Sequence, residues 1–98
     1  MARTSARPKK QSRGQVTLEC KAENASEVFV AGTFNDWDAT RDRLTRVGTD
    51  GCFRTSLTLP KGRHEYKFVV DNVWCADPQN PECAPNDQGS VNSVLVVP

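Results

Sequence analysis

The stretch that most constrains the fold runs from Arg63 to Trp74, with the sequence RHEYKFVVDNVW. Polar and apolar residues alternate along its first part, so that Tyr66 and Lys67 fall on opposite faces of a predicted strand. The Asp71-Asn72 dipeptide predicts a tight turn, because Asn tolerates the positive φ that a short hairpin requires. The stretch therefore predicts a hairpin that fixes Lys67 on an exposed face and Trp74 just beyond the turn.

Other segments have strand patterns of the same kind: residues 16–21, 27–32, 44–47, 52–59 and 91–97. Residues 27–32 are apolar on both faces, which favours a central strand, whereas we expect 44–47 to be a short edge segment. Pro60-Lys61-Gly62 predicts a hairpin turn between two neighbouring strands.

Ala76 to Asp87 predicts a loop, because its three prolines disfavour regular structure. No helical period extends beyond one turn. Several short strands with regular turn signals indicate an all-β protein, with two antiparallel sheets packed as a β-sandwich.

The 98 residues allow a single domain, which we place at residues 15–98. Residues 1–14 contain five basic side chains and no acidic one, and they predict a disordered basic tail. A basic arm that contacts a polyanion is the alternative, but the tail lacks aromatic residues for base stacking, so nucleic acid is not an expected partner. The sequence contains neither an apolar run of membrane-spanning length nor an apolar signal region, so we expect no membrane association and a cytoplasmic location.

The cysteines are Cys20, Cys52, Cys75 and Cys83. No two of them form a C-x-x-C pair and the chain has one histidine, so we expect no zinc site, no other metal and no cofactor. Free thiols are the default expectation, and a bridge between Cys75 and Cys83 across their loop is left open. Cys20 and Cys52 fall on opposite faces of their strands, which argues against a bond between them.

Residues suited to catalysis are few. His64 is in phase with Tyr66, which favours a core histidine over a catalytic base. Asp36 and Asp38 lie in a turn-rich segment, where capping hydrogen bonds account for them. The chain lacks nucleophile-elbow and phosphate-loop patterns, so we expect that it is not an enzyme.

The two tryptophans, Trp37 and Trp74, have two interpretations. Each ring could anchor the core, or the two could form exposed platforms. An exposed aromatic face packs against the apolar C–H face of a pyranose while nearby polar groups bind the hydroxyls. Lys67 and Asn92 are suitable donors, because both are out of phase with the apolar residues next to them.

Four segments, in order, carry a family resemblance: EVFVAGTFNDW at residues 27–37, LPKGRHEYKFVVD at 59–71, Trp74 with Asp77-Pro78, and GSVN at 89–92. With these motifs, the chain from about residue 15 to 97 resembles the family 48 carbohydrate-binding modules. The likeness is greatest to the glycogen-binding domains of AMP-activated protein kinase β subunits.

The resemblance implies an immunoglobulin-like (E-set) sandwich that binds α-1,4-glucans such as glycogen, starch, maltooligosaccharides and cyclodextrin. Carried over by position, Trp37 and Trp74 would be stacking platforms. Lys67 and Asn92 would bind sugar hydroxyls, and Ser90 stands where the kinase domain has a threonine. The alternative within the same fold is a protein-interaction or targeting module in a kinase-scaffold or glycogen-metabolism assembly.

Gln88 and Asn72 depart from the kinase pattern, and Cys75 and Cys83, which flank the Trp74 loop, are not part of it. Gln88 replaces a leucine that projects into the glucan helix, which should weaken or retune binding to curved glucans. Asn72 replaces the usual turn glycine, which we expect to be tolerated because Asn accepts the left-handed conformation.

Overall fold

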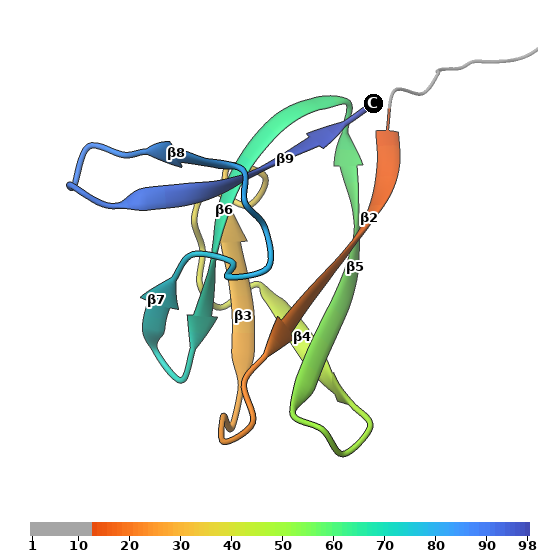
Figure 1. Ribbon diagram of the computed structural model, residues 1–98. Coiled ribbons are helices and arrows are strands. Elements are labelled where there is room, and N and C mark those ends of the chain that lie inside the picture. Colours follow the sequence, from red (N-terminus) through yellow and green to blue (C-terminus); the bar gives the residue numbers. More distant parts are fainter. Residues whose placement is uncertain (1–12) are drawn as a thin grey trace, which may run out of the picture.

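The computed structural model describes residues 13–98, which form an all-β protein (Figure 1). The strands in this part of the chain are β2 (Arg13–Lys21), β3 (Val28–Gly32), β4 (Asp42–Val47), β5 (Cys52–Pro60), β6 (Gly62–Val70), β7 (Val73–Cys75), β8 (Cys83–Pro85) and β9 (Val91–Val97). Most of the basic tail expected at residues 1–14 lies outside the described residues. Arg13 and Gly14, which we placed in the tail, belong to β2 and pair with β5.

The strands form one continuous antiparallel path in the order β2-β5-β4-β3-β6-β9-β8, with β7 paired to β6. The path curls so that β2 and β5 lie across from β3 and β6, as the two layers of a sandwich do (Figure 1). The expected β-sandwich is therefore confirmed. β4 lies where the path passes from one layer to the other, because its first half pairs with β3 and its second half with β5.

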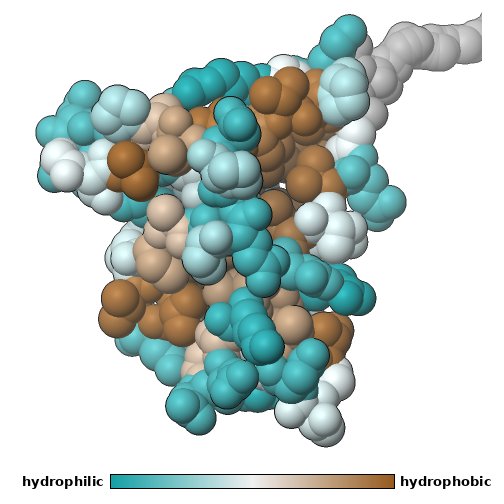
Figure 2. Space-filling model, viewed as in Figure 1, coloured by the Kyte–Doolittle hydropathy of each residue, from teal (hydrophilic) through white to brown (hydrophobic). Residues whose placement is uncertain are grey.

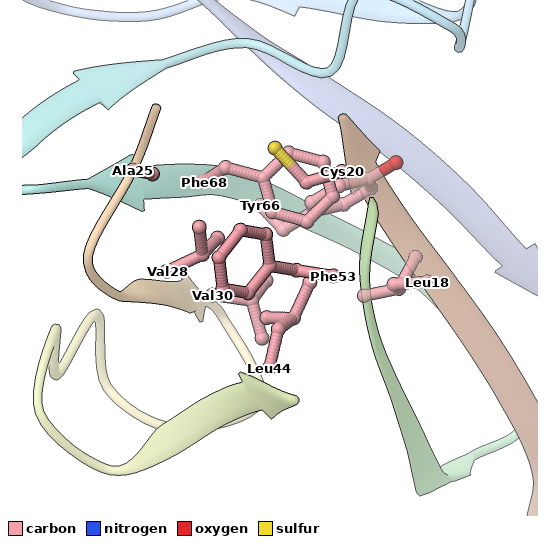
Figure 3. Packing of buried hydrophobic residues seen from close by; sticks show 9 residues of the cluster. All are labelled: Leu18, Cys20, Ala25, Val28, Val30, Leu44, Phe53, Tyr66 and Phe68. Carbon is pink, nitrogen blue, oxygen red and sulfur yellow. The ribbon is translucent and has the colours of Figure 1, made fainter. Parts of the chain in front are cut away.

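The core lies between the layers and draws on strands of both (Figure 3). Phe68 and Val30 are fully buried in one layer, and Phe53 from the other layer is 3% exposed. Tyr66 packs edge-to-face on Phe68, with ring centroids 5.7 Å apart. Apolar side chains at every second position of β3, β5 and β6 thus meet in one cluster, whose burial removes apolar area from water and stabilises the fold.

The predicted hairpin at residues 63–74 is confirmed. Val70 pairs with Val73 across a two-residue turn, and Asp71 and Asn72 have φ values of 47° and 71°. Positive φ at both central positions matches a hairpin turn whose twist fits the flanking strands. The Asp71 carboxylate also accepts hydrogen bonds from the backbone N–H groups of Ser26 and Glu27, so it ties this turn to the start of β3.

Three local predictions were wrong. Pro60-Lys61-Gly62 is no hairpin turn: β5 already has β2 and β4 on its edges, so the chain crosses to the other layer and β6 pairs with β3 and β9. The segment at 44–47 is no edge, because β4 pairs on both sides. The loop after Ala76 contains strand β8, and Pro85 is tolerated as its last residue.

Candidate functional site

The outer face of the β3–β6–β7 layer carries the first part of the candidate site. Because side chains alternate along a strand, Lys67 and Val69 face outward while Phe68 faces the core. Trp74 lies directly opposite Val69 in the β6–β7 pair. Lys67 and Trp74 are therefore diagonal neighbours on one face, where long side chains interact. Trp74 is 45% exposed, whereas Val69 beneath it is 4% exposed.

The loop after β3 brings Trp37 to the same region. Asn35, which is 2% exposed, holds this loop. Its Oδ1 accepts a hydrogen bond from the Gly32 N–H at 3.0 Å, and its Nδ2 donates to the Val30 carbonyl at 3.0 Å and to Asp42 Oδ2 at 2.7 Å. These hydrogen bonds fix the turn that precedes Trp37 and Asp38.

Trp37 itself has the left-handed conformation, with φ of 59°. This conformation is unusual for a large side chain and costs on the order of 1–3 kcal/mol, so it persists only where neighbouring contacts hold it. Here the Trp37 N–H donates to the Gly32 carbonyl at 2.9 Å. Asp38 then closes the loop by accepting from the Thr40 N–H and hydroxyl, and these hydrogen bonds hold the pKa of Asp38 below its ordinary value.

The β8–β9 connection supplies the third part. The register of β6 with β9 pairs Tyr66 with Ser93, so the next residues, Lys67 and Asn92, lie side by side beyond the last pair on the outer face. Lys67 Nζ donates to Ser90 Oγ at 3.0 Å. Residues from the hairpin and from the loop before β9 thus meet through this register.

These parts border an open cleft with a volume of about 490 Å³. It is lined by Trp37, Lys67, Trp74, Asn86, Asp87, Gln88 and Asn92. A cleft with aromatic side chains and a few convergent polar groups is suited to a small polar ligand that also has apolar faces. Figure 2 shows that apolar surface on the face in view lies in separate areas, over the β7 end, over the β8–β9 hairpin and near the C-terminus. The exposed large apolar side chains include Val73, Trp74, Val91 and Val96.

Residues 15–98 match the family described as the glycogen recognition site of AMP-activated protein kinase. The match covers the sandwich except the first two residues of β2, and it includes each residue that lines the cleft. The chain belongs to this family.

Similar proteins agree with this family. The chain is 37% identical over 93 residues to the human 5'-AMP-activated protein kinase subunit beta-2. The aligned region covers 95% of this chain and 32% of that subunit. The chain is also 37% identical over 71 residues to the pig subunit beta-1, covering 72% of this chain and 54% of that sequence. The chain thus spans about a third of the length of the beta-2 relatives that it matches.

Two solved structures that resemble this chain are less than 25% identical to it and show the fold alone. The ferric enterobactin esterase of Salmonella typhimurium superposes with a TM-score of 0.71 at 18% identity, covering 92% of this chain and 33% of the esterase. The enterobactin esterase FES of Shigella flexneri gives the same score at 16% identity, covering 94% of this chain and 32% of that one. Identities this low carry no activity across to a glycogen-recognition domain.

Five of the six residues proposed from the sequence line the cleft: Trp37, Lys67, Trp74, Gln88 and Asn92. Ser90 does not line it but contacts Lys67. Asn92 is 7% exposed and already has two side-chain partners, so it is less free than the sequence suggested.

The sequence reasoning missed three residues: Asn35, Asn86 and Asp87. Asn86 and Asp87 line the cleft, and Asn35 holds the Trp37 loop. Their signal in the sequence was weak, because Asn and Asp in loops are common turn residues. Only the folded structure shows that the side chains of Asn35 and Asn86 bond to side chains on other elements.

The domain family is a carbohydrate-binding one and is non-catalytic. His64 is half-buried: its Nε2 lies 2.8 Å from the Pro60 carbonyl oxygen and its ring packs edge-on against Phe34. Residues 13–98 contain no group of three or more His, Cys, Asp or Glu side chains placed to hold a metal ion. In the same residues no helix is long and apolar enough to cross a membrane.

The cysteines are free, including Cys75 and Cys83, whose bridge was left open. Cys20 is buried in the core and Cys52 is half-buried, in keeping with the opposite faces predicted for them. Burial raises the pKa of the Cys20 thiol to about 11, and burial also raises the pKa of Cys75. Thiols with raised pKa values are poor nucleophiles at neutral pH.

Proposed function

We propose that this domain binds α-1,4-linked glucans, such as glycogen, starch, maltooligosaccharides and cyclodextrin, by tryptophan stacking and hydrogen bonds to hydroxyls. The observation that carries the proposal is that Trp37 and Trp74, 37 residues apart in the chain, line one cleft together with Lys67. Burial of both rings in the core would have favoured a protein-docking role. Family membership supports glucan as the ligand.

The cleft offers both kinds of contact that a glucan needs. The exposed indole of Trp74 has an apolar face for the C–H face of a pyranose. Lys67 carries three donors, of which Ser90 takes one, so two remain for sugar hydroxyls. Glucan hydroxyls also donate, and the Asp87 carboxylate and the Gln88 amide oxygen are acceptors in the same lining. No covalent step or metal is needed.

We expect the affinity to be modest. An open cleft contacts one face of the ligand, and a flexible glucan loses conformational freedom when it binds. Gln88 adds a polar side chain where the resemblance implies a leucine, so we expect weak retention of curved ligands. Gln88→Leu should then increase the affinity for β-cyclodextrin more than the affinity for a short linear maltooligosaccharide.

Retention on amylose resin tests the proposed ligand class. The domain should bind amylose, should be eluted by maltose or β-cyclodextrin, and should pass through cellulose, whose glucose units are β-linked. Retention on neither resin would contradict the proposal. Equal retention on both would contradict selectivity for α-linked glucan.

A second candidate function is docking within a kinase assembly. It is favoured by one finding: the relatives are named as subunits of a kinase, and this domain spans about a third of the beta-2 subunits. In that role the sandwich would contact a protein partner instead of, or in addition to, a glucan. Free maltoheptaose would separate the two functions, because it should compete with glucan at the cleft and leave protein docking elsewhere unaffected.

A further inference from the structure

A continuous chain of side-chain hydrogen bonds runs from β6 to the loop at residues 86–90. Asn92 Nδ2 donates to Glu65 Oε1 at 3.0 Å, and Asn86 Nδ2 donates to Asn92 Oδ1 at 3.1 Å. Asn86 and Asn92 both line the cleft, whereas Glu65, on β6, is not among the residues that line it. None of the sequence motifs had assigned a role to Glu65 or Asn86.

Asn86 closes the loop that carries Gln88. Its Oδ1 accepts hydrogen bonds from the backbone N–H groups of Gln88 at 2.9 Å and Ser90 at 3.1 Å. Its own N–H donates to the Ser90 carbonyl at 3.0 Å. One side chain therefore holds both Gln88, which lines the cleft, and Ser90, which contacts Lys67.

The donor and acceptor roles in this series of hydrogen bonds are fixed at both of its ends. At the loop end, backbone N–H groups can only donate, so Asn86 must present Oδ1 to them and Nδ2 to Asn92. At the other end, an ionised Glu65 can only accept, so Asn92 must turn Nδ2 toward it and Oδ1 toward Asn86. Without this acceptor, Asn86 Nδ2 would still require Oδ1 of Asn92, but Asn92 Nδ2 would lose its partner on β6 and the loop would lose its link to that strand.

Glu65 is itself held in place. Its Oε2 accepts from Arg63 Nη1 at 2.7 Å, and its side chain is 23% exposed. The hydrogen bonds from Asn92 and Arg63 hold the pKa of Glu65 below its ordinary value, so the group is ionised at neutral pH. Asn92 is 7% exposed, so water is poorly placed to replace the carboxylate as its partner.

We propose that Glu65 is a positioning residue for the binding cleft, acting through Asn92 and Asn86 on the loop that carries Gln88 and Ser90. It need not touch the ligand. Asn92 uses its Oδ1 and one Nδ2 hydrogen in the hydrogen bonds to Asn86 and Glu65. One Nδ2 hydrogen therefore remains for a sugar hydroxyl. The inference rests on the proposed glucan-binding function for its ligand, but its effect on the loop exists without ligand.

The test compares Glu65→Met, which keeps the length and removes the acceptor, with Glu65→Gln, which keeps an acceptor oxygen and removes the charge. Glu19→Met is the matched control, because Glu19 forms a surface ion pair with Arg54 in the other layer. Two quantities are measured on each folded protein: hydrogen exchange at the Gln88 and Ser90 amides without ligand, and the Kd for maltoheptaose. If Glu65→Met does not fold, Glu65→Val replaces it, because Val favours strands and also lacks an acceptor.

In Glu65→Met we expect faster exchange at both amides and an affinity about tenfold weaker, the effect of about one lost hydrogen bond. Glu65→Gln and Glu19→Met should resemble the wild type in both quantities. Unchanged exchange in Glu65→Met would overturn the inference. Equal losses in Glu65→Gln and Glu65→Met would also overturn it, because charge and not acceptance would then be responsible. If the wild type binds no glucan, the proposed function fails, and amide exchange alone still decides the role of Glu65.

Discussion

Lys67 Nζ donates a hydrogen bond to Ser90 Oγ at 3.0 Å, which links the middle of β6 to a loop 23 residues later. The contact holds a long, flexible side chain at the cleft and leaves its other donors free. We predict that Lys67→Met weakens maltoheptaose binding by about tenfold, because it removes the ammonium donors and keeps the stem. Isothermal titration calorimetry measures this change.

Ser90→Ala is the companion variant. It leaves the Lys67 ammonium intact and removes only the group that holds it, so we expect a smaller loss of affinity. A larger loss in Ser90→Ala than in Lys67→Met would mean that Ser90, and not Lys67, makes the main polar contact with the ligand. Thermal unfolding should be nearly unchanged in both variants, because Ser90 is exposed and Lys67 lies on the outer face.

Asn35 gives a prediction about stability. Asn35→Ala removes three hydrogen bonds from a side chain that is 2% exposed, and it leaves the Gly32 N–H and the Val30 carbonyl without these partners. Buried groups that lose their partners are costly, so we expect the free energy of unfolding to fall by about 2–4 kcal/mol. Urea denaturation measures it. Asp38→Ala in the same loop is the control, and it should cost much less because Asp38 is exposed; equal effects would contradict the anchoring role of Asn35.

The raised pKa of the Cys20 thiol predicts a loss of stability at alkaline pH. Burial raises its pKa from an ordinary 9.0 to about 11, so the folded state binds the thiol proton more tightly than the unfolded state does. This contribution is fully present below about pH 9 and is lost as the pH rises toward about 11. Burial and a hydrogen bond to Asp77 raise the pKa of Tyr66 as well, which acts in the same direction.

The free energy of unfolding should therefore be flat from pH 7 to 9 and decline above pH 9, as measured by urea denaturation at each pH. Cys20→Val, with a similar apolar volume and no proton to lose, should decline less steeply. An equal decline in both proteins would assign the alkaline effect to other groups.

The reactivity of the thiols tests separately whether Cys20 is buried between the two layers and Cys83 is exposed. Cys83 is exposed and Cys20 is buried with a raised pKa, so an alkylating reagent should modify Cys83 first in the native protein. Mass spectrometry of the peptides after brief treatment with iodoacetamide distinguishes them. Rapid modification of Cys20 under native conditions would contradict its place in the core.

The sequence was sufficient where the signals are local. The hairpin at residues 63–74 combines period-2 alternation with a turn dipeptide, and both features act between near neighbours. The connection at Pro60-Lys61-Gly62 was wrong for the complementary reason. A turn signal indicates that the chain reverses, but which strand pairs next depends on the free edges in the assembled sheet.

The candidate site shows the same limit. Trp37, Lys67 and Asn92 lie on different elements, and only the family resemblance grouped them before the register of β6 with β9 did so. The roles of Asn35 and Asn86 could not be predicted from the sequence, because they depend on long-range contacts. Each side chain forms hydrogen bonds within its own loop and also with a side chain on another element. An Asn that only forms a local turn has the same sequence signature.

The most direct measurement is a titration of the domain with maltoheptaose, followed by tryptophan fluorescence, for the wild type and Trp74→Ala. The wild type should give a saturable change, because Trp37 and Trp74 line the cleft. Trp74→Ala should bind at least about tenfold more weakly, whereas Val96→Ala, another exposed apolar position, should bind normally. No saturable response up to about 10 mM ligand, or unchanged affinity in Trp74→Ala measured by calorimetry, would contradict glucan binding through this cleft.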